Sequence, residues 1–302
     1  MKPSRAPIVL AAVERCGRRL WAHCYRMTGR RAEADDLSQA AIARALERGD
    51  DLHDEAAVDG WLFRIATTVC LDHLRRVKRV HGLTELVDPV VLDDLMGPPG
   101  GPETSLLLRE DVRIAIVTAL QHLAPRQRAV LLLHDVCELP LAEVASTLGT
   151  NGNAAKAALH RARAALDRAR GGTAVDARVD AELVERLARA LEDRSVDALA
   201  ALLSDDVWGI VDGGGVVPVA SRPTVGASAL LRRFANLSQR VGQQVACHVV
   251  QLNAEPAVLV TLPESGGAIF ASVHVEAHGG RIVAMRVVRD PAKLAPLRTA
   301  VN

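Results

Sequence analysis

Apolar positions recur every three or four residues over the first quarter of the chain, which is the period of amphipathic helices. From residue 8 to residue 80 there is no proline, and the good helix formers Ala, Leu, Arg and Glu dominate. Gly29 and the cluster at 49–51 interrupt the pattern. We therefore predict three or four helices in this region.

The helical pattern stops between residues 81 and 108. This segment is rich in Pro and Gly, carries five acidic residues and contains neither Lys nor Arg, which is typical of an acidic linker. The pattern returns over 109–170, where Pro125 is placed to begin one helix and Pro140 another. Gly149 is placed to end the second of these.

The last third of the chain changes character. Residues 180–207 read as helix, turn and helix, and from Trp208 onward short Val-rich runs are broken by Gly and Pro. Hairpin-like breaks fall at 265–267 and 279–280. We predict two all-α domains, a helical bundle and a helix-turn-helix domain, followed by an α+β domain with a curved antiparallel sheet. The expected boundaries are 8–80, 81–108 for the linker, 109–170 and 179–302.

Composition narrows the class of protein. The chain has 302 residues, 49% of them hydrophobic, and a formal net charge of +1. Five scattered cysteines form no CxxC pair, so we expect reduced thiols and no metal site. No apolar run is long enough to cross a bilayer. We expect a cytoplasmic protein that binds no membrane.

One predicted helix combines an apolar face with a basic stripe. Trp61, Arg64, Thr68, Arg75 and Arg79 lie within about 60° of one another on a helix. Guanidinium groups neutralise phosphates, and an aromatic ring can stack at a base step, so this stripe suits nucleic acid. The alternative is a solvated basic face with Trp61 half-buried as a core anchor.

A second basic helix follows a predicted turn at Gly149, in a helix-turn-helix pattern. On the first helix of this pair we expect Ala142, Ala145 and Leu148 to pack inward. The second helix has a buried stripe of Ala155, Leu159, Ala162 and Leu166, and a second, polar stripe formed by Lys156, His160 and Arg163. Recognition helices contact base edges near their N-terminus and phosphates elsewhere. We expect base contacts from Asn151, Asn153 and Lys156, and phosphate contacts from Arg161, Arg168 and Arg170.

Residues 8–170 resemble an extracytoplasmic function (ECF) sigma factor, the small two-domain initiation subunit of bacterial RNA polymerase. Four motifs occur in the family's order. The first is Ala-Glu-Asp-Leu-x-Gln, matched by Ala34, Asp35, Asp36, Leu37 and Gln39. The second runs from Trp61 to Arg75, the third is LAPRQR at 123–128 with Ala124 in place of the usual Pro, and the fourth runs from Arg161 to Leu166.

The resemblance implies two partners, core RNA polymerase (its clamp helices and flap) and promoter DNA. It also implies that the protein needs no cofactor and is not an enzyme. Contacts to the clamp helices fall to Asp35, Asp36, Leu37 and Gln39. The first domain, with the loop at 50–60, would melt the minus-10 element, using Phe63 and Thr68 as walls of a base pocket. The family commonly has Asn where Thr68 stands. The second domain would read the minus-35 element, and the acidic linker would thread the RNA exit path. The implied DNA-binding residues are Trp61, Phe63, Arg64, Thr68, Arg75, Arg76, Lys78, Arg79, Asn153, Lys156, His160, Arg161 and Arg163.

Residues 179–302 resemble the SnoaL-like, NTF2-like cone found as an extension on one class of ECF sigma factors. The resemblance rests on DGGG at 212–215, on 223–226, on 253–257 and on the segment 289–294. It implies a built-in regulator that replaces a separate anti-sigma protein. The implied interdomain contacts are Asp212, Gly213, Gly214, Gly215, Asp290, Pro291, Lys293 and Leu294.

A second hypothesis comes from a different class of protein. The chain could be a helix-turn-helix regulator fused to a cone that binds a small molecule or catalyses a reaction with Asp212, His248 or His274. A simple regulator would bind duplex promoter DNA alone, whereas a sigma factor should need core polymerase. A small-molecule ligand in the cone is compatible with both hypotheses.

Overall fold

The computed structural model describes residues 5–77, 87–89, 114–169, 176, 178–220, 222–242 and 244–301. Chain contacts form two compact units, one of residues 1–81 and 99–172 and the other of residues 82–98 and 173–302. Most of the predicted acidic linker lies outside the described residues. Within the described ranges, no helix combines the length and the apolarity that a membrane span requires.

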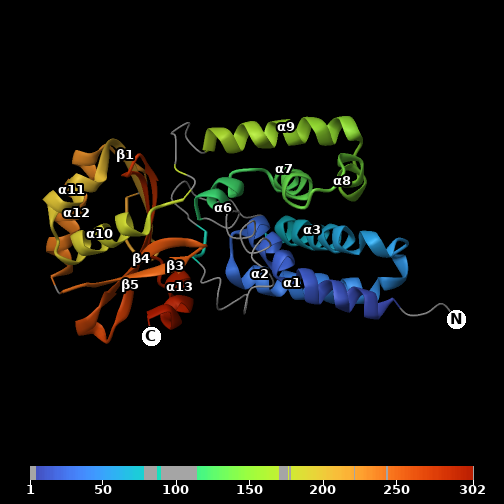
Figure 1. Ribbon diagram of the computed structural model, residues 1–302, viewed down its shortest axis with the longest axis horizontal. Coiled ribbons are helices and arrows are strands. Elements are labelled where there is room, and N and C mark those ends of the chain that lie inside the picture. The colour runs from blue at the N-terminus through green and yellow to red at the C-terminus, as the bar shows by residue number, and fades with distance from the viewer. Residues whose placement is uncertain are drawn as a thin grey trace. The chain divides into compact units, whose positions relative to one another are not determined.

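Three long helices begin the first unit and pack against one another (Figure 1): α1 (Ala6–Thr28), α2 (Arg31–Glu47) and α3 (Val58–Val77). Two short 3-10 turns, Gly49–Asp51 and Glu55–Ala57, separate α2 from α3. Gly29 ends α1 with a φ of 71°, and its N–H donates to the carbonyl of Tyr25 at 2.7 Å. The predicted helices and the break at Gly29 are confirmed.

A second group of helices completes this unit: α6 (Ile114–Gln121), α7 (Pro125–Leu131), α8 (Leu141–Thr147) and α9 (Gly152–Ala169). A π-helical turn, Leu132–Val136, extends α7. Pro125 begins α7 and Pro140 directly precedes α8, as predicted. Gly149 has a φ of 60° in the turn between α8 and α9.

The helix-turn-helix packs by its apolar stripes. On α9 the stripe of Ala155, Leu159 and Ala162 is buried, and α9 contacts α7 and α8. The expectation that Ala142 packs inward is wrong, because Ala142 is exposed and Val144 is buried instead. Ala145 and Leu148 are buried as expected; the buried face of α8 runs through Val144, Ala145 and Leu148, and Ala142 lies outside it at about 100° per residue.

The second unit contains a six-stranded sheet with the order β2-β1-β6-β5-β4-β3. Its strands are β1 (Leu203–Asp212), β2 (Thr224–Val225), β3 (Ala246–Leu252), β4 (Glu255–Leu262), β5 (Ala268–His278) and β6 (Arg281–Val288). Helices α10 (Ala181–Glu192) and α11 (Val196–Leu202) precede the sheet, and α12 (Ala227–Val241) follows β2. Both hairpin breaks are confirmed, and so are the two helices predicted within 180–207, but the second helix ends at Leu202 and β1 begins at Leu203, five residues before the strand predicted from Trp208.

One expectation about the sheet is wrong. The strands from β3 to β6 form an antiparallel meander, but β1 pairs with β6 in parallel, so the sheet is mixed. In the sequence, α12 lies between β1 and the antiparallel strands β3 to β6. Because no hairpin joins β1 to β6, the two strands can pair in parallel. The local strand patterns carry no information about this long-range pairing.

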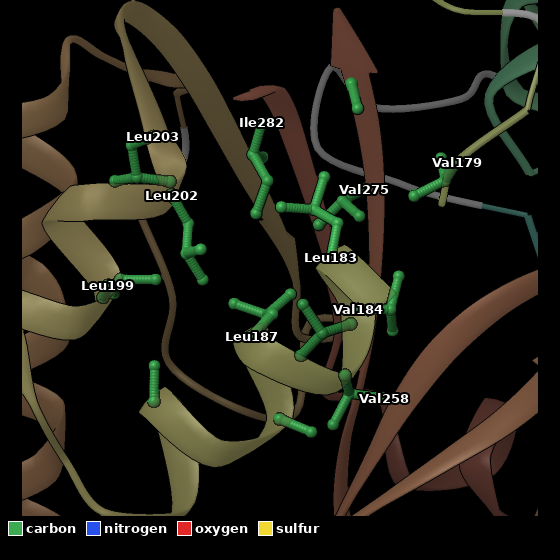
Figure 2. Close-up of a cluster of buried hydrophobic side chains, with 14 of the residues drawn as sticks. Val179, Leu183, Val184, Leu187, Leu199, Leu202, Leu203, Val258, Val275 and Ile282 are labelled. Carbon is green, nitrogen blue, oxygen red and sulfur yellow. The ribbon is translucent and has the colours of Figure 1, made fainter. Parts of the chain in front are cut away.

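The core of the second unit lies between α10, α11 and one face of the sheet. Figure 2 shows Leu183, Val184 and Leu187 of α10 directed at the strands that carry Val258 and Ile282. The C-terminal segment, α13 (Pro291–Leu294) and the 3-10 turn Ala295–Val301, contacts β5 on its way to the end of the chain. Residues 257–261 of the inner strand β4 are all buried, which indicates that both sheet faces are covered there.

Candidate nucleic-acid interface

The basic stripe on α3 is at least partly accessible. Trp61, Arg64 and Thr68 are half-buried, whereas Arg75 and Arg76 are exposed. Asp72 lies beneath the two exposed arginines: Arg75 Nη1 is 3.2 Å from its Oδ1, and Arg76 Nε donates to its backbone carbonyl. Lys78 and Arg79, which were predicted to extend the stripe, lie outside the described residues.

Phe63 and Thr68, the predicted walls of a base pocket, differ in accessibility. Phe63 is only 3% exposed; its ring meets His23 edge to face at 5.6 Å and carries the guanidinium of Arg19 at 5.4 Å. In this structure Phe63 is therefore a core residue. The hydroxyl of Thr68 donates to the carbonyl of Arg64 at 3.0 Å, so its hydrogen is used inside the helix.

A buried histidine of α1, His23, contacts the core-facing side of α3. The Thr67 hydroxyl donates to the carbonyl of Phe63, so it accepts from Nε2–H of His23 across 2.8 Å. Nδ1 of His23 then accepts from the thiol of Cys137 at 3.8 Å. Burial, and secondarily the charge of Arg26, lowers the pKa of His23 to about 3. The ring is therefore neutral at physiological pH and joins α1, α3 and the π-helical turn.

The second helix of the helix-turn-helix, α9, presents the predicted polar residues to solvent. The exposed set is Asn153, Lys156, His160, Arg161 and Arg163. Asn151 has a structural role as well, because its Oδ1 accepts from the backbone N–H of Ala154 at 2.8 Å and caps the helix. Arg163 forms a two-pronged ion pair with Asp135, with Nη2 2.6 Å from Oδ1. The side chain of Arg168, and all of Arg170, lie outside the described residues.

Contacts also join the two helical groups within the first unit. Arg64 of α3 forms an ion pair with Glu143 of α8, with 3.0 Å between Nη1 and Oε2. Helix α3 also approaches the segment before α8 closely at Gly60, where an added Cβ would lie 2.8 Å from a methyl of Leu139. A residue predicted to contact DNA is thus engaged by the helix-turn-helix in this structure.

Arg128, the last residue of the LAPRQR motif, was missed as a structural residue. It is 2% exposed, and its guanidinium donates to the carbonyls of Met27, Gln121 and Leu123 and to Oε1 of Gln121. Gln121 in turn donates to the carbonyl of Arg26 at 3.0 Å. Two carbonyls at the end of α1 are therefore satisfied by side chains from α6 and α7. The motif was a signal, but the sequence does not show where the guanidinium points.

The residues predicted to grip the polymerase lie on α2. Asp35, Asp36 and Gln39 are exposed, and Asp35 accepts from the indole N–H of Trp21 at 2.6 Å. Leu37 is only 8% exposed and packs in the helical bundle. The polar members of the set are thus accessible, whereas Leu37 holds the helix in place.

The predicted regulatory residues of the second unit also divide into buried and exposed members. Asp212 and Lys293 form an ion pair of 2.6 Å with side chains 4% and 3% exposed. Asp290 and Leu294 are also buried, whereas Gly214, Gly215 and Pro291 are exposed. A Cβ on Gly214 would lie 2.2 Å from the Asp290 carboxylate, so this glycine permits a close approach. The neighbouring Val216 is 74% exposed and was missed by the sequence analysis.

A cavity of about 410 Å³ lies between α12 and the sheet of the second unit. The three side chains considered for catalysis, Asp212, His248 and His274, are not among its lining residues. His274 is buried, hydrogen-bonds to Ser272 at 3.2 Å and has a pKa lowered to about 3, first by burial and then by Arg286. These three residues therefore do not form a reactive group in the cavity.

Comparison with known proteins decides the family. Two family models match, sigma-70 region 2 over residues 12–80 and sigma-70 region 4 over residues 113–166. The ECF RNA polymerase sigma factor SigJ of Mycobacterium tuberculosis is 33% identical over 230 residues, which is 72% of this chain and 69% of SigJ. The chain belongs to the ECF RNA polymerase sigma factors. This confirms the family that was predicted from the four sequence motifs.

Two further comparisons show how much of this ECF sigma factor is similar to its relatives in sequence and in structure. SigG of M. tuberculosis is 37% identical over 214 residues, and the chain spans 58% of the length of SigG. The crystal structure of M. tuberculosis SigJ superposes with a TM-score of 0.72 at 28% identity, over 95% of this chain and 98% of SigJ. The predicted fold class, helical sigma domains followed by an α+β cone, is confirmed.

Proposed function

We propose that the chain binds core RNA polymerase and directs it to specific promoters. The observation that carries this proposal is the membership of the ECF sigma factors together with exposed cationic side chains on two helices of one chain, α3 and α9. Cationic side chains on the surface neutralise DNA phosphates, and side chains near the start of α9 are suited to base edges. The exposed Asp35, Asp36 and Gln39 supply a polar surface for the clamp helices.

The parts of the chain receive separate roles in this proposal. Residues 8–80 bind the polymerase and the minus-10 element, residues 109–170 read the minus-35 element, and residues 81–108 link them. Residues 179–302 regulate the activity in place of a separate anti-sigma factor. The close approach of Gly214 to Asp290 and the exposure of Val216 support a contact surface at this loop.

In-vitro transcription with purified core polymerase tests both halves of the proposal. The full chain should give promoter-specific transcripts only when core polymerase is present, and it should not bind duplex promoter DNA tightly by itself. Specific binding of the chain alone to promoter DNA would instead indicate an ordinary helix-turn-helix regulator. A chain that ends near residue 178 should change the transcript yield, and an unchanged yield would refute the regulatory role.

A small molecule in the cavity of the second unit is the proposed signal. The cavity is within the range of about 300–1,000 Å³ that small-molecule sites occupy. Its presence beside the segment 212–215 gives a ligand a route to the regulatory loop.

A further inference from the structure

The cavity is built against an amphipathic helix whose apolar side chains pack only partly on the core beneath it. Helix α12 carries Leu230, Phe234, Leu237 and Val241 along the cavity, yet none of its residues is fully buried. Leu237 remains 37% exposed. In a filled interior such side chains would be buried in contact with neighbours, so this helix faces space that an apolar ligand can occupy.

The sheet side of the cavity is also apolar. Strands β1, β4, β5 and β6 contribute Ile210, Val260, Val273, Met285 and Val287 to its lining. Gly209 lies among them, and a Cβ there would stand 2.7 Å from a methyl of Leu230. The ligand must therefore have an apolar body, because these walls offer it few hydrogen bonds.

The charged lining has only one sign. Arg194, Arg233, Arg240 and Arg289 line the cavity, and among its described lining residues there is no Asp or Glu. Arg194 donates to the carbonyl of Ser238 at 3.1 Å, and Arg233 donates to the hydroxyl of Thr224. These two guanidinium groups already have partners, and Arg240 is exposed to solvent.

Arg289 is different from the other three. Its guanidinium carbon lies 4.0 Å above the ring of Phe270, and its buried Nε has no hydrogen-bond partner among the described residues. Burial lowers the pKa of Arg289, which means that the charged form is poorly solvated where it stands. The buried Nε is closed to a ligand, but the guanidinium to which it belongs lines the cavity and has no carboxylate partner among the described residues, so an anion beside it would stabilise a poorly solvated charge.

We propose that this cavity binds a small monocarboxylate with an aliphatic body, and that the carboxylate accepts from the guanidinium of Arg289. A carboxylate matches the planar edge of a guanidinium with two parallel hydrogen bonds. The aliphatic part of the ligand fills the space between α12 and the sheet. The role of this ligand as a regulatory signal rests on the proposed function, whereas the binding of the ligand to the cavity does not.

The position of Arg289 connects the cavity to the regulatory loop. Its backbone N–H donates to the carbonyl of Asp212 at 2.7 Å, and the next residue is Asp290, which approaches Gly214. A carboxylate bound by Arg289 is thus one residue from the contact between Asp290 and the segment 212–215. Occupancy of the cavity can alter the loop without a large rearrangement.

Calorimetric titration of the full chain with octanoate and with 1-octanol tests the ligand class. Octanoate should bind the wild-type chain more tightly than 1-octanol does, and Arg289→Gln should weaken octanoate by about tenfold or more while leaving 1-octanol unchanged. Arg289→Lys should keep a preference for octanoate because it keeps the charge. Arg232→Gln, on the exposed side of α12 and outside the cavity lining, is the matched control and should bind both like the wild type. Thermal melting of each variant in the absence of ligand checks that it is folded.

Equal binding of octanoate and 1-octanol, no binding of either, or an unchanged octanoate affinity in folded Arg289→Gln would overturn the proposal. Transcription assays with and without octanoate then separate the two ideas. Selective octanoate binding with unchanged transcription would support the ligand class and refute its role as a regulatory signal.

Discussion

The carboxylate of Asp212 and the ammonium group of Lys293 form a buried ion pair that joins the end of β1 to α13. The two residues are 81 positions apart in the sequence, and 2.6 Å separates Oδ2 from Nζ. Oδ1 of Asp212 also accepts from the backbone N–H of Gly214 at 2.8 Å. One carboxylate therefore organises both the glycine loop and the C-terminal segment.

Removal of one partner of this pair should destabilise the second unit strongly. Lys293→Ala leaves a buried carboxylate without its ammonium group, and we expect a loss of about 3–5 kcal/mol in the free energy of opening. Hydrogen exchange of the amides in β1 and β6 measures it. The control is Arg189→Ala, which breaks the exposed pair with Glu185 and should cost about 0–1 kcal/mol. Equal losses in the two variants would show that burial of the Asp212 pair has no energetic consequence.

The exposed Val216 should matter for regulation rather than for stability. Val216→Ser removes an apolar surface that is 74% exposed, so the free energy of unfolding should change by less than about 0.5 kcal/mol. If the loop contacts another part of the chain or the polymerase, transcript yield should change. The matched control is Val196→Ser, which alters a valine that is 37% exposed at the start of α11. The same yield from both variants would remove Val216 from the contact surface.

The elements that the sequence predicts well are those with local causes. Helical periodicity, Pro125 and Gly149 all act within one turn of chain, and each helix they define is present. The parallel pairing of β1 with β6 depends on residues more than 70 positions apart, for example Trp208 and Ala284, and no local pattern encodes it. The hydrogen-bond partners of buried polar side chains are equally unpredictable from local sequence. The partners of Arg128 and of Asp212 are set by the packing of several elements.

Site residues were predictable as surfaces and not as individual contacts. The exposed stripe on α9 follows directly from the helical period, since its buried counterpart is Ala155, Leu159 and Ala162. Phe63 shares the buried face of α3 with Cys70 and Leu74, so the helical period alone predicts its burial; only the resemblance made it a pocket wall. The position and lining of the cavity beside α12 were not predictable, because they depend on how α12 packs against distant strands, which no local pattern encodes.

Position 68 should affect the choice of base more than the overall affinity. The Thr68 hydroxyl donates its hydrogen to the carbonyl of Arg64, whereas the side-chain amide of an Asn can both donate and accept hydrogen bonds. We expect Thr68→Asn to change the minus-10 base preference of the polymerase complex, as measured over a promoter library. Arg75→Gln provides the contrast: loss of an exposed cation should weaken all promoters alike and reduce the salt slope by about one. An unchanged base preference in Thr68→Asn would show that this residue does not read the base.

The ion pair between Arg64 and Glu143 should compete with DNA for the same guanidinium. Glu143→Gln releases Arg64, and because the pair is partly exposed we expect promoter affinity of the polymerase complex to rise by no more than about fivefold. Fluorescence anisotropy with labelled promoter DNA measures the change. Glu47→Gln, at the exposed end of α2, removes the same charge and controls for the change in net charge. A comparable rise in both variants would assign the effect to net charge alone.

Stability of the first unit should depend on pH through His23. The pKa of His23 is about 3 in the folded chain, against about 6.5 for an unfolded histidine. Between these values the unfolded state binds more protons, so the stability that His23 contributes is present above about pH 6.5 and is lost as the pH falls. Between pH 6.5 and about 5.5 the expected loss is about 1 kcal/mol. Hydrogen exchange of amides in α1 and α3 at the two pH values measures it.

Two variants isolate this contribution from the other titrating groups. His23→Gln retains a hydrogen-bonding side chain opposite Thr67 but cannot titrate, so its opening free energy should lose the slope in this pH range. His53→Gln alters an exposed histidine in the loop before α3 and should keep the wild-type slope. A slope that persists unchanged in His23→Gln would mean that this buried ring is not the source of the pH dependence.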